Sequence, residues 1–143
     1  AKKGRNFAEK LGLPMAFIEK RRDPTGVSVH ALTVIGDVHG KNVVLVDDEV
    51  NTGGSVVGTV EILKQHGAGD IYLCFTHASF SPQAAERLAG LPIREIVCTD
   101  TVPISPESRQ LLSNLTVLSV APLLGEVMRR VHEGESVGEM FGE

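Results

Sequence analysis

Apolar residues recur along the chain in two patterns, short runs that predict strands and helical spacings that predict the connections between them. The strongest run, at 43–46, is four residues long and ends on two aspartates. Because the run is unbroken, we expect this strand to be buried on both faces, as in a parallel sheet. Strands are predicted at 15–20 (short and buried), 30–38, 41–48, 70–77, 94–100 and 116–121, and helices at 2–12, 55–66, 81–90 and 122–134, with a short one inside 106–112.

The alternation of strands with helices predicts an α/β fold with a mostly parallel sheet flanked by helices. A chain of 143 residues has the size of a single domain with a core of its own. We expect the last helix to pack into that core through five apolar residues on one side: Leu123, Leu124, Val127, Met128 and Val131.

Composition excludes several classes of protein. Hydrophobic residues make up 42% of the chain and charged residues 22%, which is ordinary for a globular domain and excludes disorder. No apolar run approaches the roughly 20 residues that a membrane span needs, so no membrane association is expected. Cys74 and Cys98 lie in apolar runs, which favours buried, reduced thiols in a cytoplasmic protein over a disulfide or a zinc site.

Charge is distributed unevenly along the sequence. The first 22 residues hold seven basic and two acidic side chains, whereas the whole chain has a net charge of −4. A nucleic-acid-binding protein is usually basic overall, and the sequence pI of about 5.7 argues against that class. A locally basic end on an acidic chain suits a small anionic ligand better.

The loop that follows the strongest strand has the composition of an anion-binding site. Its adjacent glycines let backbone N–H groups converge, and Thr52 and Ser55 add hydroxyl donors. The dipole of the next helix stabilises a bound anion by about 0.3–1 kcal/mol. The alternative is an ordinary capped helix after a glycine turn. Neither a Walker A loop nor a GxGxxG motif occurs in the sequence. The loop residues are Asn51, Thr52, Gly53, Gly54 and Ser55.

Two adjacent carboxylates, Asp47 and Asp48, precede this loop. They repel each other and are costly to desolvate at the end of a valine-rich strand. A sugar diol or Mg²⁺ would relieve both costs, whereas a solvated strand end is the structural alternative. A carboxylate pair followed by a phosphate loop is the arrangement that a sugar phosphate requires, with the diol at one end and the phosphate at the other.

Residues 43–55, VVLVDDEVNTGGS, resemble the phosphoribosyl-binding signature of the type I phosphoribosyltransferase fold. Further stretches extend the match through nearly the whole chain and resemble the C-terminal half of ribose-phosphate pyrophosphokinase, which makes phosphoribosyl pyrophosphate. The resemblance implies one phosphoribosyltransferase-like domain over 1–143, taken from a two-domain enzyme and lacking the first strand of its sheet. The stretches that carry it are 1–22, 35–48, 76–81, 99–103 and 118–141.

The resemblance also implies an activity and residue roles. Such a kinase transfers the diphosphoryl group of ATP to the C1 hydroxyl of ribose 5-phosphate with Mg²⁺, and it is a cytoplasmic homo-oligomer. Residues 52–55 would hold the 5-phosphate, and Asp47 and Asp48 would hold the ribose hydroxyls and the metal ion. Lys20 and Arg22 match the basic pair of the family's mobile catalytic loop. Taken alone, residues 20–22 would more often be a solvated basic turn.

Departures from the family pattern leave alternatives open. Asn51 stands where the family usually has an acid, and an amide can neither act as a base nor attract a cation as a carboxylate does. The N-terminal half, which contacts ATP and supplies a metal-site histidine, is not in this sequence. The alternatives are a non-catalytic ribose-phosphate-binding relative or associated subunit, and a base phosphoribosyltransferase. His77 follows a strand, where it could line the crevice, but a structural histidine is the more common case in such a place. The C-terminal stretch 136–141 resembles a regulatory and oligomer-forming segment of the family.

Overall fold

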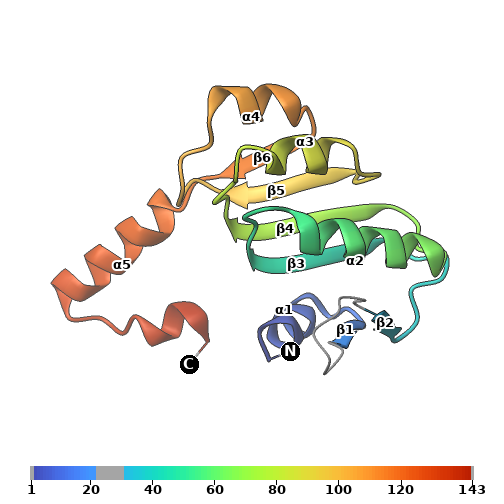
Figure 1. The fold of residues 1–143 in the computed structure, drawn as a ribbon. Coiled ribbons are helices and arrows are strands. Elements are labelled where there is room, and N and C mark those ends of the chain that lie inside the picture. The colour runs from blue at the N-terminus through green and yellow to red at the C-terminus, as the bar shows by residue number, and fades with distance from the viewer. Residues whose placement is uncertain (1, 22–30, 143) are drawn as a thin grey trace.

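The computed structural model describes residues 2–21 and 31–142, which form a parallel sheet, a separate antiparallel pair of strands and the helices around them (Figure 1). The elements in chain order are α1 (Lys2–Leu11), β1 (Phe17–Arg21), β2 (Ala31–Ile35), β3 (Val43–Glu49), α2 (Gly54–Gln65), β4 (Ile71–His77), α3 (Ala84–Ala89), β5 (Glu95–Thr99), α4 (Pro106–Leu111), β6 (Leu115–Leu118), α5 (Ala121–Glu133) and the 3-10 helix η1 (Gly138–Phe141).

The parallel sheet has the strand order β3-β4-β5-β6, so each strand lies beside the next one in the sequence. Helix α2 connects β3 to β4, and helix α3 connects β4 to β5. This topology confirms the expected α/β fold with a mostly parallel sheet flanked by helices. The carboxyl ends of β3, β4 and β5 lie at one edge of the sheet (Figure 1), and this edge positions the candidate site.

The core lies on one face of the sheet. Side chains at alternate positions of β4 and β5 are buried there, and apolar residues of α2 and α3 cover them. The opposite face of the same two strands is half-buried. The buried side chains at the centre of this core include Val60, Leu63, Ile71, Leu73, Leu88, Ile96 and Cys98.

The antiparallel pair β1–β2 carries the N-terminal part of the chain. Phe17 pairs with Ile35 and Arg21 with Ala31, so the two strands run antiparallel to each other. Phe17 and Ile18 are half-buried rather than buried, so the expectation of a buried strand over 15–20 is wrong. Ile18 is partly buried and packs against the core.

The expectation that β3 is buried on both faces is wrong for the described residues. Val44 is 43% and Val46 is 42% exposed, because β3 is the edge strand of the parallel sheet and α2 covers its other face. The unbroken apolar run therefore predicted the strand correctly, but it did not predict how far the strand is buried.

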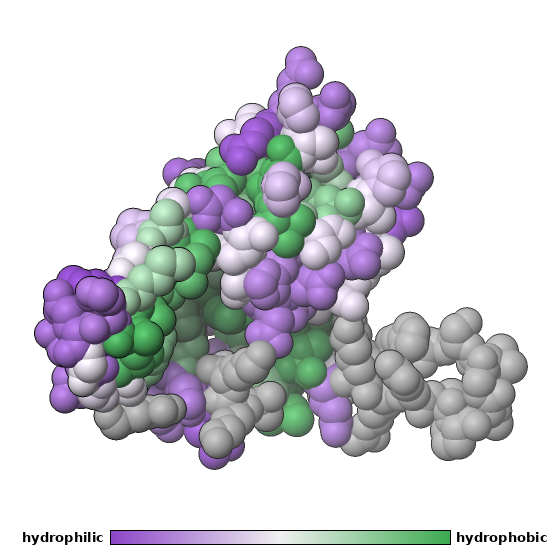
Figure 2. Space-filling view, turned by 90° about the vertical axis from the view of Figure 1, so that its left-hand side faces the viewer, coloured by the Kyte–Doolittle hydropathy of each residue, from purple (hydrophilic) through white to green (hydrophobic). Residues whose placement is uncertain are grey.

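The expectation that the last helix packs into the core is also wrong for the described residues. Helix α5 buries none of its residues; it leaves the carboxyl edge of the sheet and extends away from it (Figure 1). Figure 2 views the molecule from the side on which α5 lies and shows apolar surface between polar patches there. The exposed apolar residues of α5 include Leu123, Leu124, Met128 and Val131.

Both cysteines are free thiols, with Cys98 buried and Cys74 half-buried. Desolvation raises the pKa of each thiol, so both stay protonated near neutral pH. Among the described residues, no helix is long and apolar enough to cross a membrane.

Candidate functional site

The strand β3 and the loop that follows it are fixed in place by backbone hydrogen bonds to the β4 side of the sheet. Val43 N–H donates to Asp70 C=O over 2.8 Å at the start of the strand, and Val50 N–H donates to His77 C=O over 3.1 Å at its end. Ser81 N–H donates to Asn51 C=O over 3.0 Å. The first residues of the loop are therefore held by the end of β4 and by the segment that leads from β4 to α3.

Gly53 lets the loop turn into helix α2. It stands at the N-cap with φ of 74°, a left-handed conformation that glycine adopts without the strain other residues meet. A Cβ atom built on it would be 3.8 Å from its nearest neighbours, so conformation and not space requires glycine here. Thr52 Oγ1 accepts from Gly54 N–H at 3.4 Å, and Gly53 C=O accepts from Val57 N–H at 3.0 Å.

A cavity of about 250 Å³ opens at this loop. Polar side chains and the backbone of the helix start form most of its lining, and the volume suits a phosphate group with part of a sugar. The structure thus brings together Asp47 and four of the five predicted loop residues; Gly54 does not line the cavity. Its lining consists of Asp47, Glu49, Val50, Asn51, Thr52, Gly53, Ser55 and Val56.

Strand geometry separates the two predicted aspartates. Successive side chains of a strand point to opposite faces, so Asp47 shares its face with Glu49 and not with Asp48. Asp47 and Glu49 both line the 250 Å³ cavity, whereas Asp48 does not. The Asp48 N–H donates to Asp47 Oδ1 over 2.8 Å, which orients that carboxylate. Sequence reasoning missed Glu49, although the two-residue period of a strand was the signal that could have found it.

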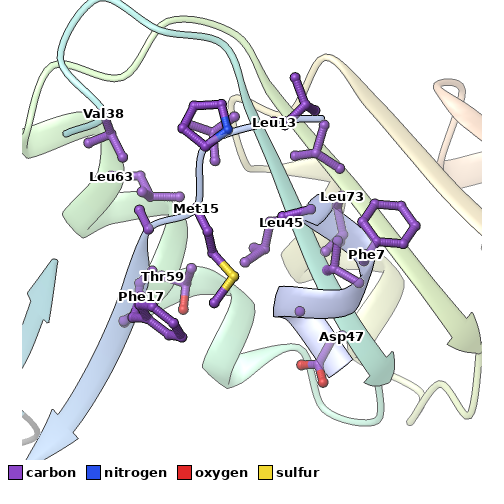
Figure 3. A pocket seen from close by; sticks show the side chains of 18 of the residues that line it. Phe7, Leu13, Met15, Phe17, Val38, Leu45, Asp47, Thr59, Leu63 and Leu73 are labelled. Carbon is purple, nitrogen blue, oxygen red and sulfur yellow. The ribbon is translucent and has the colours of Figure 1, made fainter. Parts of the chain in front are cut away.

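A larger groove of about 910 Å³ runs along β3 and joins the cavity at Asp47, Ser55 and Val56. Figure 3 shows apolar side chains such as Phe7, Met15 and Leu45 gathered in this groove, with Asp47 at its end near the carboxyl end of β3. Asp48 lines the groove as well. Both predicted aspartates therefore line one groove, which also includes Ser55 of the loop.

Hydroxyl groups gather at the carboxyl ends of the next two strands. Thr99 Oγ1 donates to Thr76 C=O over 2.7 Å and lies 2.9 Å from Thr101 Oγ1. His77 Nδ1 lies 2.9 Å from that same Thr101 hydroxyl. His77 is thus hydrogen-bonded within this cluster, which agrees with the structural role that the sequence favoured for it. The cluster also fixes the backbone of β4 that holds Val50.

Asp100 lies at the same edge and organises the start of α5. Its carboxylate accepts a hydrogen bond from Val120 N–H over 2.9 Å. The pKa of Asp100 is lowered below its usual value, mainly by a hydrogen bond with Ser119 and next by this bond from Val120. The aspartate therefore stays ionised down to acidic pH. Its charge supports the positive end of the α5 dipole, which is a structural role beside the site.

The predicted catalytic pair lies mostly beyond the part of the chain that the structure describes. The backbone of Lys20 belongs to β1 and pairs with Leu32 of β2, but its side chain is not described. Arg22 lies outside the described residues. The placement of Lys20 near the end of the β1–β2 pair is what the geometry adds to the sequence prediction.

The donor set fits a hard cation held jointly with a ligand. The described residues contain no cluster of three or more histidine, cysteine, aspartate or glutamate side chains that could enclose a metal ion. Mg²⁺ commonly binds through one or two carboxylates together with substrate oxygens and water, and Asp47 supplies such a carboxylate in the cavity. Asp48 could join it from the adjoining groove.

One side chain that sequence reasoning missed contacts the loop from helix α3. Arg87 Nη1 donates to Thr52 C=O over 2.8 Å, and the aliphatic part of Arg87 lies beside Gly53. The sequence offered one weak signal, since α3 follows the neighbouring strand and begins at the same edge of the sheet.

Taken together, the carboxyl edge of the sheet offers carboxylates that can accept hydrogen bonds from hydroxyl groups and backbone N–H groups that can donate to an anion.

Comparison with known proteins links this geometry to one family. Residues 24–142 match the family model described as the phosphoribosyl synthetase-associated domain. A ribose-phosphate pyrophosphokinase of Caldanaerobacter subterraneus subsp. tengcongensis is 46% identical over 139 residues, and one of Nostoc sp. is 48% identical over 140 residues. Each alignment covers 97% of this chain, but only 43% and 42% of the respective relative.

A solved structure agrees with the sequence relatives. The crystal structure of phosphoribosylpyrophosphate synthetase from Mycobacterium smegmatis is similar with a TM-score of 0.81 and 39% sequence identity. The match covers 94% of this chain and 43% of the other. The chain thus spans about two fifths of the length of the relatives that it matches.

Proposed function

This chain belongs to the ribose-phosphate pyrophosphokinase family through its phosphoribosyl synthetase-associated domain, and we propose that it supplies the ribose 5-phosphate site of such an enzyme. The observation that carries the proposal is the 250 Å³ cavity at the carboxyl end of β3. It joins a carboxylate to a glycine loop at the start of a helix, which are the two groups that a sugar phosphate needs. A chain that spans about two fifths of the length of its relatives would hold one side of the active site.

In this proposal the loop residues 52–55 bind the 5-phosphate. The helix dipole contributes about 0.3–1 kcal/mol, so backbone N–H groups and hydroxyls supply most of the attraction. Asn51 and Asp47 border the same cavity and would receive the sugar end, with Asp48 beside them. Carboxylates accept hydrogen bonds from ribose hydroxyls, and this fixes the direction in which the sugar lies.

The reaction proposed for the whole enzyme is a diphosphoryl transfer from ATP. The C1 hydroxyl oxygen of ribose 5-phosphate attacks the β-phosphorus, the bond from that phosphorus to the α-phosphate oxygen breaks, and AMP leaves as the hydroxyl proton is lost. When bound, Mg²⁺ would neutralise phosphate charge, and Asp47 and Asp48 would hold it. Lys20 and Arg22 would neutralise charge on the transferring group, because such a step depends mainly on positioning and electrostatics. A cytoplasmic homo-oligomer is part of the same proposal.

Asn51 favours a second candidate, a non-catalytic relative that binds ribose 5-phosphate. An amide in this cavity can donate to a sugar oxygen, but it carries no charge to attract a cation. The two candidates differ in the effect of an Asn51→Asp variant on AMP release from ATP in the presence of ribose 5-phosphate. A gain of release in the variant alone supports the non-catalytic relative, whereas release by the unaltered protein supports the enzyme.

The shared substrate site is tested by calorimetric titration with ribose 5-phosphate in the presence of Mg²⁺. We expect saturable binding that weakens roughly ten- to a hundredfold in Asp47→Asn, because hydrogen bonds to a charged group are worth about 1.5–3 kcal/mol. The matched control is Asp70→Asn, at the opposite end of the neighbouring strand, which should bind as the unaltered protein does. Absence of binding by a folded protein would overturn the proposal.

A further inference from the structure

We propose that Arg87 is a positioning residue of the phosphate loop, which acts through a backbone carbonyl and not through the ligand. The inference rests on the function proposed above and deepens it. The observation is the hydrogen bond of 2.8 Å from Arg87 Nη1 to Thr52 C=O. This contact brings a charged side chain from another helix onto the backbone of the loop.

Because the peptide group is planar, the contact of Arg87 with Thr52 C=O also determines the direction of the Gly53 N–H. In a trans peptide the C=O and the following N–H point in opposite directions, and the structure has no cis bond among its described residues. Because Thr52 C=O points to Arg87 on α3, the N–H of Gly53 points away from α3. That is the side on which the loop lines the cavity, since no α3 residue is part of its lining.

The Gly53 N–H is available for a ligand in this arrangement. It has no acceptor among the described residues, although Gly53 itself is buried. An N–H group without a protein acceptor is rare and costly to leave unsatisfied, so its natural partner is an oxygen in the cavity. If the peptide rotated, the carbonyl oxygen would face a bound phosphate and repel it. Arg87 holds the peptide in the orientation that attracts the anion.

The packing around Gly53 supports a dedicated contact. Leu88, which is buried, and the Cβ of Arg87 lie 3.8–3.9 Å from the place where a side chain on Gly53 would begin. Helix α3 therefore supports the loop on one side while its arginine fixes the carbonyl. Within the described chain, Arg87 has no carboxylate within salt-bridge distance that would compete for the guanidinium group.

The test compares Arg87→Met, Arg87→Lys and the control Arg94→Met, an exposed arginine between α3 and β5. Calorimetry should show ribose 5-phosphate binding about tenfold weaker in Arg87→Met, an intermediate loss in Arg87→Lys, and no change in Arg94→Met. The amide resonance of Gly53 provides a second readout. We expect it to shift on ligand binding in the unaltered protein, and to lose most of that shift in Arg87→Met while the melting temperature stays the same.

The outcomes separate this inference from the function on which it rests. Unchanged affinity and an unchanged Gly53 shift in Arg87→Met would overturn the positioning role and leave the proposed site intact. A failure of the unaltered protein to bind ribose 5-phosphate would overturn both. Equal losses in Arg87→Met and Arg87→Lys, with the Gly53 shift retained, would also contradict a role exerted through the loop peptide.

Discussion

Helices α2 and α5 both begin at the carboxyl edge of the parallel sheet, but they are held in place by different forces. Helix α2 packs Val56, Thr59, Val60 and Leu63 into the core. Helix α5 has no buried residue, although its sequence is the more clearly amphipathic of the two. Amphipathic spacing indicates where an apolar face will form, but it does not indicate what will cover that face.

Charged groups, rather than packing, organise α5 and the segment that follows it. Arg129 forms ion pairs with Glu126, Glu133 and Glu135, and Arg130 with Glu126 and Glu139. Arg130 also donates to Ser136 C=O over 2.7 Å, which turns the chain toward η1. Exposed ion pairs are individually weak and respond to salt and pH, whereas the packing of α2 responds to the loss of volume.

The largest contrast should follow from removing the same side chain in each helix. Leu63 is 2% exposed in α2 and Leu124 is 50% exposed in α5. We expect Leu63→Ala to lower the free energy of unfolding by about 2–5 kcal/mol and Leu124→Ala to change it by less than about 0.5 kcal/mol. Urea denaturation measures both, and helix propensity is matched because both changes are Leu→Ala. Equal losses would show that α5 is packed as firmly as α2.

A smaller effect separates structural from functional glycines at the ends of the two helices. Gly53 precedes α2 with φ of 74°, and Gly134 follows α5 with φ of 72°. Neither has an atom close enough to obstruct a Cβ, so each change to alanine should cost about 1–2 kcal/mol of backbone strain. Only Gly53→Ala should weaken ribose 5-phosphate binding, as measured by calorimetry. Binding lost equally in Gly134→Ala would mean that the effect comes from stability alone.

The smallest effect concerns the pH dependence of α5. Hydrogen bonds first from Arg129 and then from Arg130 lower the pKa of Glu126 from its usual 4.5 to about 2. Because the pKa is lower in the folded state, the stabilisation is complete above the usual pKa and is lost as the pH falls toward about 2. Amide spectra between pH 6 and pH 2 should therefore show α5 losing helical structure before α2, and a Glu126→Gln variant should lose this pH-dependent step. Simultaneous loss in both helices would contradict a separate role for the charges.

Much of the fold was predictable from the sequence because local patterns determine it. Each strand of the parallel sheet was located from its apolar run, and helix α2 was located from its spacing and from the glycine at its end. Depth was not predictable, since Val44 and Val46 lie on an edge strand whose position depends on long-range pairing. The predictions that β1 and α5 are buried were wrong for the same reason, since the burial of an element depends on long-range contacts.

The candidate site was predictable in part. The glycine loop and Asp47 were identified from adjacent residues, and the structure places most of them around one cavity. The pairing of Asp47 with Asp48 came from adjacency in the sequence, whereas strand geometry pairs Asp47 with Glu49. Sequence reasoning missed Arg87 because its contact with Thr52 joins residues that are 35 positions apart.

An amide NMR titration with ribose 5-phosphate tests most directly whether the cavity at the end of β3 binds this ligand. We expect the largest ligand-induced shifts at Gly53 and Val56, whose N–H groups have no acceptor among the described residues. Smaller shifts should appear at Asp47, which lines the same cavity. Shifts that gather in α5 and η1, or no shifts at saturating ligand, would contradict the account.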